Sequence, residues 1–150
     1  MIALGSDHGG LALKVAIQNL LNERGIPSID CGTHSDSSVD YPDFGEKVAR
    51  EVSCGKVEKG ILVCGTGIGM SIVANKFPHV RAALVTDHFM ARMAKEHNNA
   101  NILVLGGRVL DEAQAKDMVI TWLEAVFEGG RHQARLDKIE LLEKSQCTGC

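Results

Sequence analysis

The stretch that decides the fold is Gly60-Ile61-Leu62-Val63-Cys64, which Gly65-Thr66-Gly67-Ile68-Gly69 follows directly. An uninterrupted apolar run of this kind is typical of a central parallel strand, because such a strand is buried on both faces. Alternating glycines between a strand and a helix form a nest of backbone N–H groups, which suits an anion. The pattern is neither the dinucleotide fingerprint nor a P-loop, since the glycines follow the order G-x-G-x-G and no Gly-Lys-Ser/Thr comes after them. We therefore expect an oxyanion site at the end of this strand.

Strand-like and helix-like segments alternate on both sides of this run. Short β-branched or aliphatic segments predict strands at residues 1–5, 26–31, 60–64, 80–85 and 102–105. Amphipathic spacing predicts helices at residues 11–24, 43–53, 69–76, 87–97, 111–128 and 131–144, with Asp111 as an N-cap. This alternation implies right-handed crossovers and a parallel sheet that helices cover on both faces. The predicted fold is α/β: a three-layer α/β/α sandwich with a five-stranded parallel Rossmann-like sheet and a C-terminal helical tail.

Composition supports a compact domain and excludes several classes of protein. The chain has 150 residues, a formal charge of −3, 45% apolar residues and 16 glycines. Residues 1–144 are expected to form a single domain, and residues 145–150 a frayed tail. A slightly acidic chain does not suit nucleic-acid binding, and no apolar run approaches the ~20 residues of a membrane span. The N-terminal residues lack the basic start of a secretory signal, so we expect a cytoplasmic protein.

The five cysteines are scattered along the chain, which favours reduced thiols over a disulfide framework. Cys147 and Cys150 form a lone Cys-x-x-Cys, and no second pair or His pair with zinc-ligand spacing accompanies them. Asp7, His8 and His97 could be imagined as ligands, but adjacent Asp and His residues make poor ligand geometry. We therefore expect no metal site.

Chemically useful residues follow three of the predicted strands, at the edge where parallel α/β sheets bind ligands. Asp7 and His8 come after the first strand, Cys64 ends the central strand, and Arg108 follows the last one. A helix N-terminus beside Cys64 would favour its thiolate, which is the reactive form. Two plainer interpretations stay open: Asp7 could only cap the first helix, and Cys64 could only be a small buried apolar residue.

A second set of candidates falls at the opposite edge of the predicted sheet. His97 and Asn98 end a helix that precedes the last strand, and Arg131 and Arg135 lie one helical turn apart near the C-terminus. Two arginine forks could hold one phosphate, although they could also form a solvated basic face. If both sets serve one site, a second subunit must supply His97, Arg131 and Arg135, which predicts a symmetric dimer with shared sites. The alternative is that these loops fold back across the sheet.

Several motifs occur in order along residues 1–140. They are Ser6-Asp7-His8-Gly9-Gly10 with Lys14, Asp40-Tyr41-Pro42, residues 64–71 with Ala74-Asn75-Lys76, His97-Asn98-Asn99-Ala100-Asn101, and Gly129-Gly130-Arg131-His132 with Arg135. Together they resemble ribose-5-phosphate isomerase type B, in the family that also contains galactose-6-phosphate and allose-6-phosphate isomerases. Only the final residues, with their Cys-x-x-Cys, depart from this pattern.

The resemblance implies a cofactor-free aldose–ketose isomerase that interconverts ribose 5-phosphate and ribulose 5-phosphate, on a sheet of strand order 2-1-3-5-4. By similarity, His97 assists opening of the furanose ring and Cys64 moves a proton between C2 and C1. Some family members lack this cysteine and have a glutamate where this chain has Met70, which cannot act as a base. The implied contacts for the enediolate are the amides of Gly65, Gly67, Ile68 and Gly69, with Thr66. Asp7, His8 and Asn98 would contact sugar hydroxyls or the phosphate end, and Tyr41 is a further substrate-binding residue. The implied phosphate contacts are Arg108, Arg131 and Arg135.

Two other functions stay open at this point. An isomerase of a hexose 6-phosphate, of the allose or galactose type, would differ in pocket length around residues 40–44 and Met70. A non-catalytic nucleotide-binding α/β module would keep its function without Cys64. The expected partners are a small sugar phosphate and further copies of the chain, as a homodimer or a dimer of dimers with shared active sites, and neither nucleic acid nor membrane.

Overall fold

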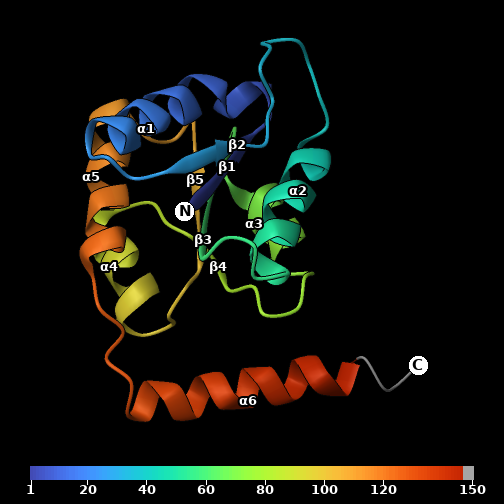
Figure 1. Cartoon of the computed structure of the whole chain (residues 1–150), viewed down its shortest axis with the longest axis vertical. Coiled ribbons are helices and arrows are strands. Elements are labelled where there is room, and N and C mark those ends of the chain that lie inside the picture. The colour runs from blue at the N-terminus through green and yellow to red at the C-terminus, as the bar shows by residue number, and fades with distance from the viewer. Residues whose placement is uncertain (147–150) are drawn as a thin grey trace.

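The computed structural model describes residues 1–146 and has the predicted alternation of strands and helices (Figure 1). The strands are β1 (Ile2–Ser6), β2 (Ser28–Asp30), β3 (Lys59–Cys64), β4 (Ala82–Leu84) and β5 (Ile102–Gly106). The helices are the 3-10 turn η1 (His8–Gly10), α1 (Leu11–Glu23), α2 (Tyr41–Ser53), α3 (Ile68–Ala74), α4 (His88–Glu96), α5 (Glu112–Glu124) and α6 (Arg131–Gln146). All strand pairs are parallel and follow the order β2-β1-β3-β5-β4, so the predicted fold class and strand order are confirmed.

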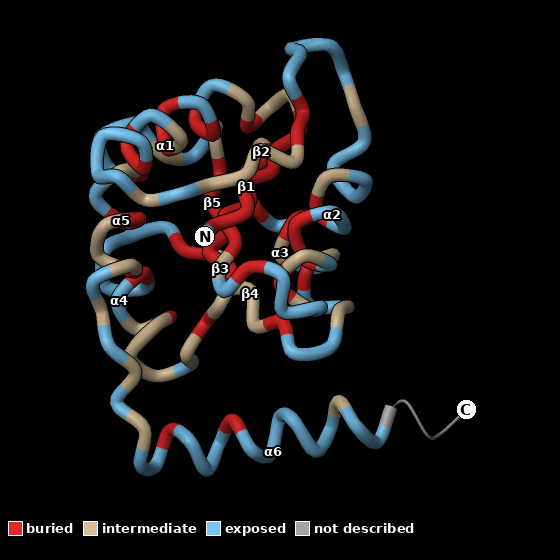
Figure 2. Tube along the Cα trace, in the orientation of Figure 1, coloured by how far each residue is buried: buried red, intermediate tan, exposed pale blue. Residues whose placement is uncertain are grey.

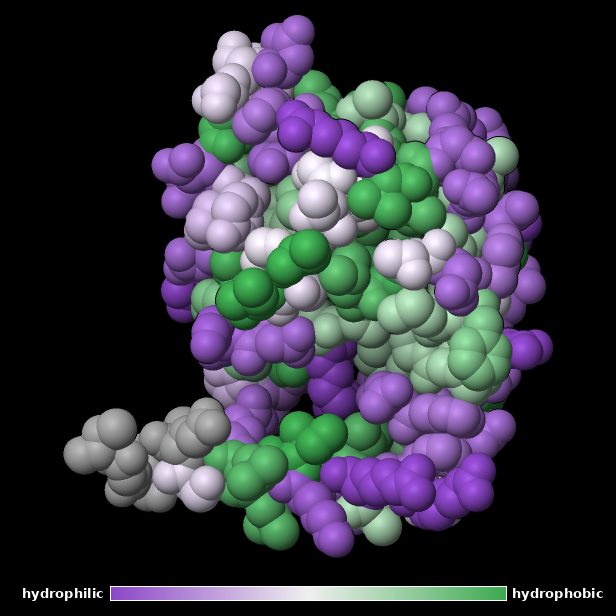
Figure 3. All heavy atoms as spheres, turned by 180° about the vertical axis from the view of Figure 1, so that it is seen from behind, coloured by the Kyte–Doolittle hydropathy of each residue, from purple (hydrophilic) through white to green (hydrophobic). Residues whose placement is uncertain are grey.

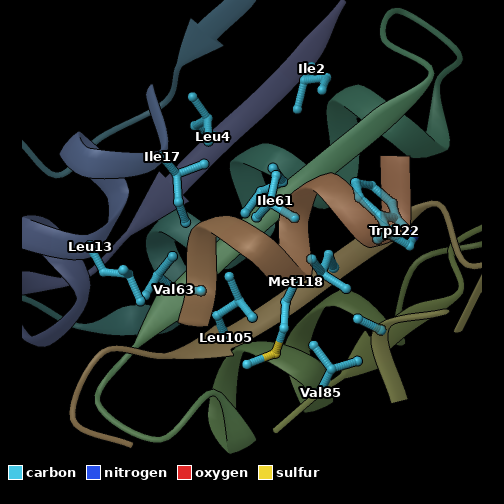
Figure 4. Packing of buried hydrophobic residues seen from close by; sticks show 14 of the residues in the cluster. Ile2, Leu4, Leu13, Ile17, Ile61, Val63, Val85, Leu105, Met118 and Trp122 are labelled. Carbon is cyan, nitrogen blue, oxygen red and sulfur yellow. The ribbon is translucent and has the colours of Figure 1, made fainter. Parts of the chain in front are cut away.

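Helices cover both faces of the sheet, which makes the three predicted layers. α1, α4 and α5 pack on one face, and α2 and α3 pack on the other (Figure 1). On the first face Leu4, Ile61 and Leu105 cluster with Met118 of α5, and Trp122 is buried in the same cluster (Figure 4). The three inner strands β1, β3 and β5 are buried almost throughout, whereas the outer strands β2 and β4 are only partly buried (Figure 2). The central strand is buried from residue 60 to residue 64, as its apolar run predicts.

The register of the strands defines two edges of the sheet. Cys64 at the end of β3 pairs with Gly106 at the end of β5, and Gly60 pairs with Ile102 near their beginnings. Ser6 ends β1 beside β3. The segments that follow β1, β3 and β5 therefore start side by side at the carboxyl edge, whereas α4 leads back to the amino edge before β5 begins.

Side chains cap the beginnings of η1, α4 and α5, and one predicted helix end is wrong by a full turn. Asp111 caps α5 in a capping box, because its side chain accepts the Gln114 N–H at 2.8 Å and its own N–H donates to the Gln114 side chain at 3.3 Å. α5 ends at Glu124, since Ala125 is extended with ψ 146°. Residues 125–130 are therefore a non-helical connection to α6, and the prediction of a helix over 111–128 fails in its last turn.

α6 lies along the amino edge of the sheet, below the sandwich (Figures 1 and 2). Most of its residues are exposed, while His132 and Leu136 are buried. Near its other end, the His79 N–H donates to Glu143 Oε1 at 2.8 Å. The Cys-x-x-Cys lies in residues 147–150, outside the described residues, so the frayed tail and the single domain stay predictions. Within residues 1–146, the structure contains no helix that combines the length and the hydrophobicity needed to span a bilayer.

Candidate active site

Cys64 ends β3, and its sulfur is held at the carboxyl edge. The residue is only 5% exposed, and the Gly67 N–H donates to its Sγ at 3.1 Å. Gly67 has φ +80°, and a Cβ there would lie 2.5 Å from Leu84 Cδ1, so this turn requires glycine. The Gly107 N–H donates to the Cys64 carbonyl oxygen at 2.8 Å. The turn therefore presents an N–H group to the sulfur.

The turn after Cys64 forms the predicted glycine nest. Thr66 Oγ1 accepts the Ile68 N–H at 3.3 Å, which fixes the threonine side chain at the turn. Arg108 lies beside Gly65: its N–H donates to the Gly65 carbonyl at 2.9 Å, and its Nη1 would be 3.5 Å from a Cβ at Gly65. The loop after β1 touches the nest as well, because a Cβ at Gly9 would lie 3.3 Å from the Gly65 nitrogen. The backbone segments that follow β1, β3 and β5 are therefore in contact at the nest.

Tyr41 lies against another part of the nest. Its ring lies over Gly69, where a Cβ would approach the ring to 2.6 Å. Pro42 is in the first turn of α2, where its missing N–H has no intrahelical partner to lose, and the helix begins two residues earlier than residue 43. Met70 is fully buried, with its Sδ 3.0 Å from the position of a Cβ at Gly45. The side chain that borders the nest is therefore that of Tyr41, whereas Met70 belongs to the core.

Asp7 and His8 follow β1 at the same edge. Asp7 is buried, and its Oδ1 accepts the Gly10 N–H at 3.0 Å and caps η1, so the capping interpretation holds for this oxygen. His8 Nδ1 accepts the Val39 N–H at 3.2 Å, which leaves Nε2 as the nitrogen that carries the proton of the neutral ring. The loop after β2 therefore sets the orientation of His8.

His97 lies at the end of α4 and belongs to a second cluster. Its ring stacks on that of His132 with centroids 4.1 Å apart and an angle of 12° between the planes. Glu128 Oε2 lies 3.3 Å from His132 Nε2 and 3.9 Å from His97 Nε2. Arg131 Nε donates to His132 Nε2 at 3.5 Å. Burial of the ring and the positive charges of His97 and Arg131 lower the pKa of His132 below its usual range. The roles of Glu128 and His132 in this cluster were not predicted from the sequence.

Within one chain the two sets of candidates lie at opposite edges, as the sequence predicts. Cys64 pairs with Gly106, whereas His97 precedes β5, which begins at Ile102. Ile102 and Gly106 are four residues apart along β5, which corresponds to about 13 Å of strand. The loops do not fold back across the sheet, since His97 faces His132 of α6. The set at the amino edge comprises His97, Asn98, Arg131 and Arg135.

Among the described residues, one group of His, Cys, Asp or Glu side chains has ligand atoms close enough to hold a metal ion. It consists of His97, Glu128 and His132, whose ligand atoms all lie within 4.8 Å of one another. The two imidazole rings are stacked nearly parallel, so their in-plane lone pairs run side by side and do not converge on one point. A tetrahedral ion would need one ring to swing out of the stack. The geometry therefore favours a charge cluster over a metal centre.

A cavity of about 650 Å³ lies between α6 and the body. Its lining comes from residues between 75 and 83, from Asn98 and Ala100, and from the inner side of α6. The hollow above α6 is visible in the space-filling view (Figure 3). It lies at the amino edge of the sheet and is separate from the nest at Cys64.

The sequence model of the family described as Ribose/Galactose Isomerase matches residues 2–139. The chain belongs to this family. Within the isomerase family, ribose-5-phosphate isomerase B of Escherichia coli (strain K12) is 46% identical over 143 residues, which cover 95% of this chain and 96% of the relative. A putative sugar phosphate isomerase of Bacillus subtilis (strain 168) is 47% identical over 144 residues, which cover 95% of this chain and 97% of the relative.

Solved structures of ribose-5-phosphate isomerase B have the same fold as the present chain. That of Clostridium thermocellum superposes with a TM-score of 0.95 at 55% identity, covering 97% of this chain and 98% of the other. That of Mycoplasma genitalium, solved with bound ribulose-5-phosphate, superposes with a TM-score of 0.92 at 43% identity and covers 95% of each chain. These matches confirm the resemblance that the motifs carry.

Proposed function

We propose that the chain is an aldose–ketose isomerase that interconverts ribose 5-phosphate and ribulose 5-phosphate. The observation that carries this proposal is the Cys64 sulfur, which accepts the Gly67 N–H beside a nest of backbone amides. The relatives support the substrate, because the Escherichia coli protein is named ribose-5-phosphate isomerase B and the Mycoplasma genitalium structure holds ribulose-5-phosphate. The reaction moves protons within one carbon skeleton, so it needs no cofactor.

Cys64 is the proposed base of the isomerisation. Its thiolate takes the proton from C2 of the open-chain aldose, and the electron pair forms the C1–C2 double bond of an enediolate. The same sulfur returns the proton to C1 while the O2 hydroxyl proton passes to O1 and the C2=O2 double bond forms, which gives the ketose. A positioned base contributes about 10²–10⁴-fold to such a step. The amides of residues 65–69, with Thr66, face the enediolate oxygens in this proposal, and loss of one such donor costs other enzymes about 3–4 kcal/mol.

The remaining candidates handle the ring and the phosphate. His97 opens the furanose ring by moving a proton at the ring oxygen. Arg131 and Arg135 lie one turn apart on α6 and hold the phosphate together with Arg108 from the carboxyl edge. The phosphate then supplies binding energy that positions the reacting carbons. The proposed sugar contacts are Asp7, His8, Tyr41 and Asn98.

A complete site requires two copies of the chain. About 13 Å of strand separates the two edges, so His97 cannot reach the nest of its own chain. The carboxyl edge also exposes apolar side chains that suit a protein interface. They are Tyr41, Ile68, Ile72, Phe89 and Val109. The proposed assembly is a symmetric homodimer, alone or within a dimer of dimers, in which one chain supplies Cys64 and the other His97, Arg131 and Arg135.

Substrate and base are tested by kinetics on the purified protein. We expect kcat/KM for ribose 5-phosphate to exceed that for allose 6-phosphate, and a preference for the hexose would overturn the substrate assignment. Cys64→Ala should abolish turnover while binding of ribose 5-phosphate, measured by calorimetry, is largely kept. A variant that keeps its activity would favour a non-catalytic role for this cysteine.

The shared site is tested by complementation. Cys64→Ala and His97→Ala should each be inactive, but a mixed dimer has one site with both residues intact. After subunit exchange of equal amounts, random pairing restores about a quarter of wild-type activity. Native mass spectrometry of differently tagged subunits confirms that mixed dimers form. If they form and no activity returns, the site is not shared.

A further inference from the structure

The carboxylate of Glu128 is placed beside His97 by the backbone. The Glu128 N–H donates to the Glu96 carbonyl at 3.0 Å, which fastens the connection after α5 to the end of α4. Gly129 and Gly130 follow with φ +65° and +53°, so the chain turns sharply there, and the His132 N–H donates back to the Gly129 carbonyl at 3.0 Å. Because of these contacts, both Glu128 and the first turn of α6 lie beside the His97 ring at the end of α4.

Glu128 Oε2 lies 3.3 Å from His132 Nε2 and 3.9 Å from His97 Nε2, and charge decides which of the two rings it stabilises in protonated form. Burial and neighbouring positive charge lower the pKa of His132, so this ring is uncharged at neutral pH, and its Nε2 already accepts Arg131 Nε at 3.5 Å. His132 then serves as a flat surface that fixes the plane of the His97 ring. The group that can compensate a proton on His97 is the Glu128 carboxylate, 3.9 Å from its Nε2.

We propose that Glu128 is a positioning residue for ring opening, acting through His97, a role that rests on the proposed isomerase function. In this step the C1–O4 bond breaks and its electron pair goes to O4. O4 takes a proton from the imidazolium of His97, and the O1 hydroxyl returns a proton to His97 as the C1=O1 double bond forms. His97 ends unchanged, and the carboxylate stabilises the charged ring before the first transfer and after the second.

Further charged groups lie on the two helices that meet at this cluster. On α4, Arg92 and Glu96 form an ion pair, with Nε and Oε2 4.0 Å apart. On α6, the positive charges of Arg131 and Arg135 act on the His132 ring, which stacks on that of His97. Glu128 brings negative charge to the same stack from the connection between α5 and α6.

The test separates ring opening from proton transfer at carbon. Ribulose 5-phosphate is acyclic, because its C5 oxygen is esterified, so exchange of its C1 hydrogen in D₂O needs the carbon base and no ring opening. Net conversion of ribose 5-phosphate needs both steps. We expect Glu128→Gln to lower net kcat about fivefold. This is the effect expected from removing one unit charge that lies about 4 Å from the His97 ring at a half-exposed site. The rate of hydrogen exchange at C1, monitored by NMR, should change less than twofold in the same variant.

Two further variants sharpen the comparison. Glu128→Asp keeps the charge and should recover part of the lost net rate. Glu124→Gln is the matched control, since Glu124 is an exposed carboxylate one turn earlier that pairs with Arg24 at 3.2 Å. Equal losses in net rate and exchange would show a merely structural role for Glu128, and an unchanged net rate would show none, so either result overturns the proposal. A wild-type protein without isomerase activity would instead refute the proposed function.

Discussion

Replacing Lys14 with methionine should cost about 3 kcal/mol of folding free energy, at the lower end of the range for breaking a buried ion pair. Lys14 is 0% exposed, and its Nζ lies 2.6 and 2.7 Å from the two Asp30 oxygens and 2.6 Å from the Thr33 carbonyl oxygen. Methionine fills a similar volume but leaves the carboxylate without its cation. The cost stays low in the range because the Asp30 side chain is 18% exposed and keeps the Gly32 N–H at 2.8 Å.

Urea unfolding at one fixed protein concentration measures this cost, because association would otherwise alter the apparent stability. With a slope of about 2 kcal/mol/M, the midpoint should fall by about 1.5 M. Lys56→Met is the control: its partner Glu51 is at 3.0 Å, but Lys56 is exposed, so no resolvable shift is expected. Adding Asp30→Asn to the Lys14 variant should recover part of the loss. A Lys14→Met midpoint equal to the wild type, or no recovery in the double variant, would refute the reasoning.

The remaining predictions concern close packing and pH. Gly10→Ala should destabilise the fold by about 3 kcal/mol in urea unfolding, the upper end of the usual range for overpacking, because the new Cβ would lie 2.5 Å from the Val63 carbonyl oxygen, a backbone atom with little freedom to move. Gly69→Ala should raise KM with little loss of stability, since its Cβ would displace the exposed Tyr41 ring that it meets at 2.6 Å. His132 has a lowered pKa in the folded chain, so the unfolded chain binds more protons as pH falls below about 6.5 and stability declines there. His132→Gln should flatten this part of the stability profile, and an unchanged slope would contradict the assignment.

The carboxyl-edge half of the site was predictable because it depends on local signals. A wholly apolar run followed by alternating glycines specifies a buried strand and a turn, and the structure has both at residues 60–69. Parallel strands bring their ends to one edge, so Arg108 and the Asp7–His8 loop follow from topology alone. The role of Asp7 as a cap was among the alternatives and is what one of its oxygens does.

The end of α5 and the Glu128 cluster were not predictable from local pattern. Ala125, Val126 and Phe127 continue an apolar segment, which favours extending the helix, but Ala125 is extended in the structure. What competes with the helix is a hydrogen bond from the Glu128 N–H to Glu96, a contact between residues far apart in sequence. The spacing of Glu128 and His132 would suit an ordinary helical pair, and its meaning depends on the end of α4 lying beside it.

The position of α6 depends on both the early end of α5 and the contact between Glu128 and the end of α4. Because the connection over 125–130 leaves the helical path, α6 runs along the amino edge and carries Arg131 and Arg135 away from the nest of its own chain (Figure 1). A helix extended to residue 128 would have sent the arginines in another direction. The bond between Glu128 and Glu96 thus fixes three things at once: the place of the Glu128 carboxylate beside His97, the start of α6, and the separation of the α6 arginines from the nest of the same chain. Loss of the Glu128 carboxylate alone should disturb only the first, since the backbone bond that sets the other two remains.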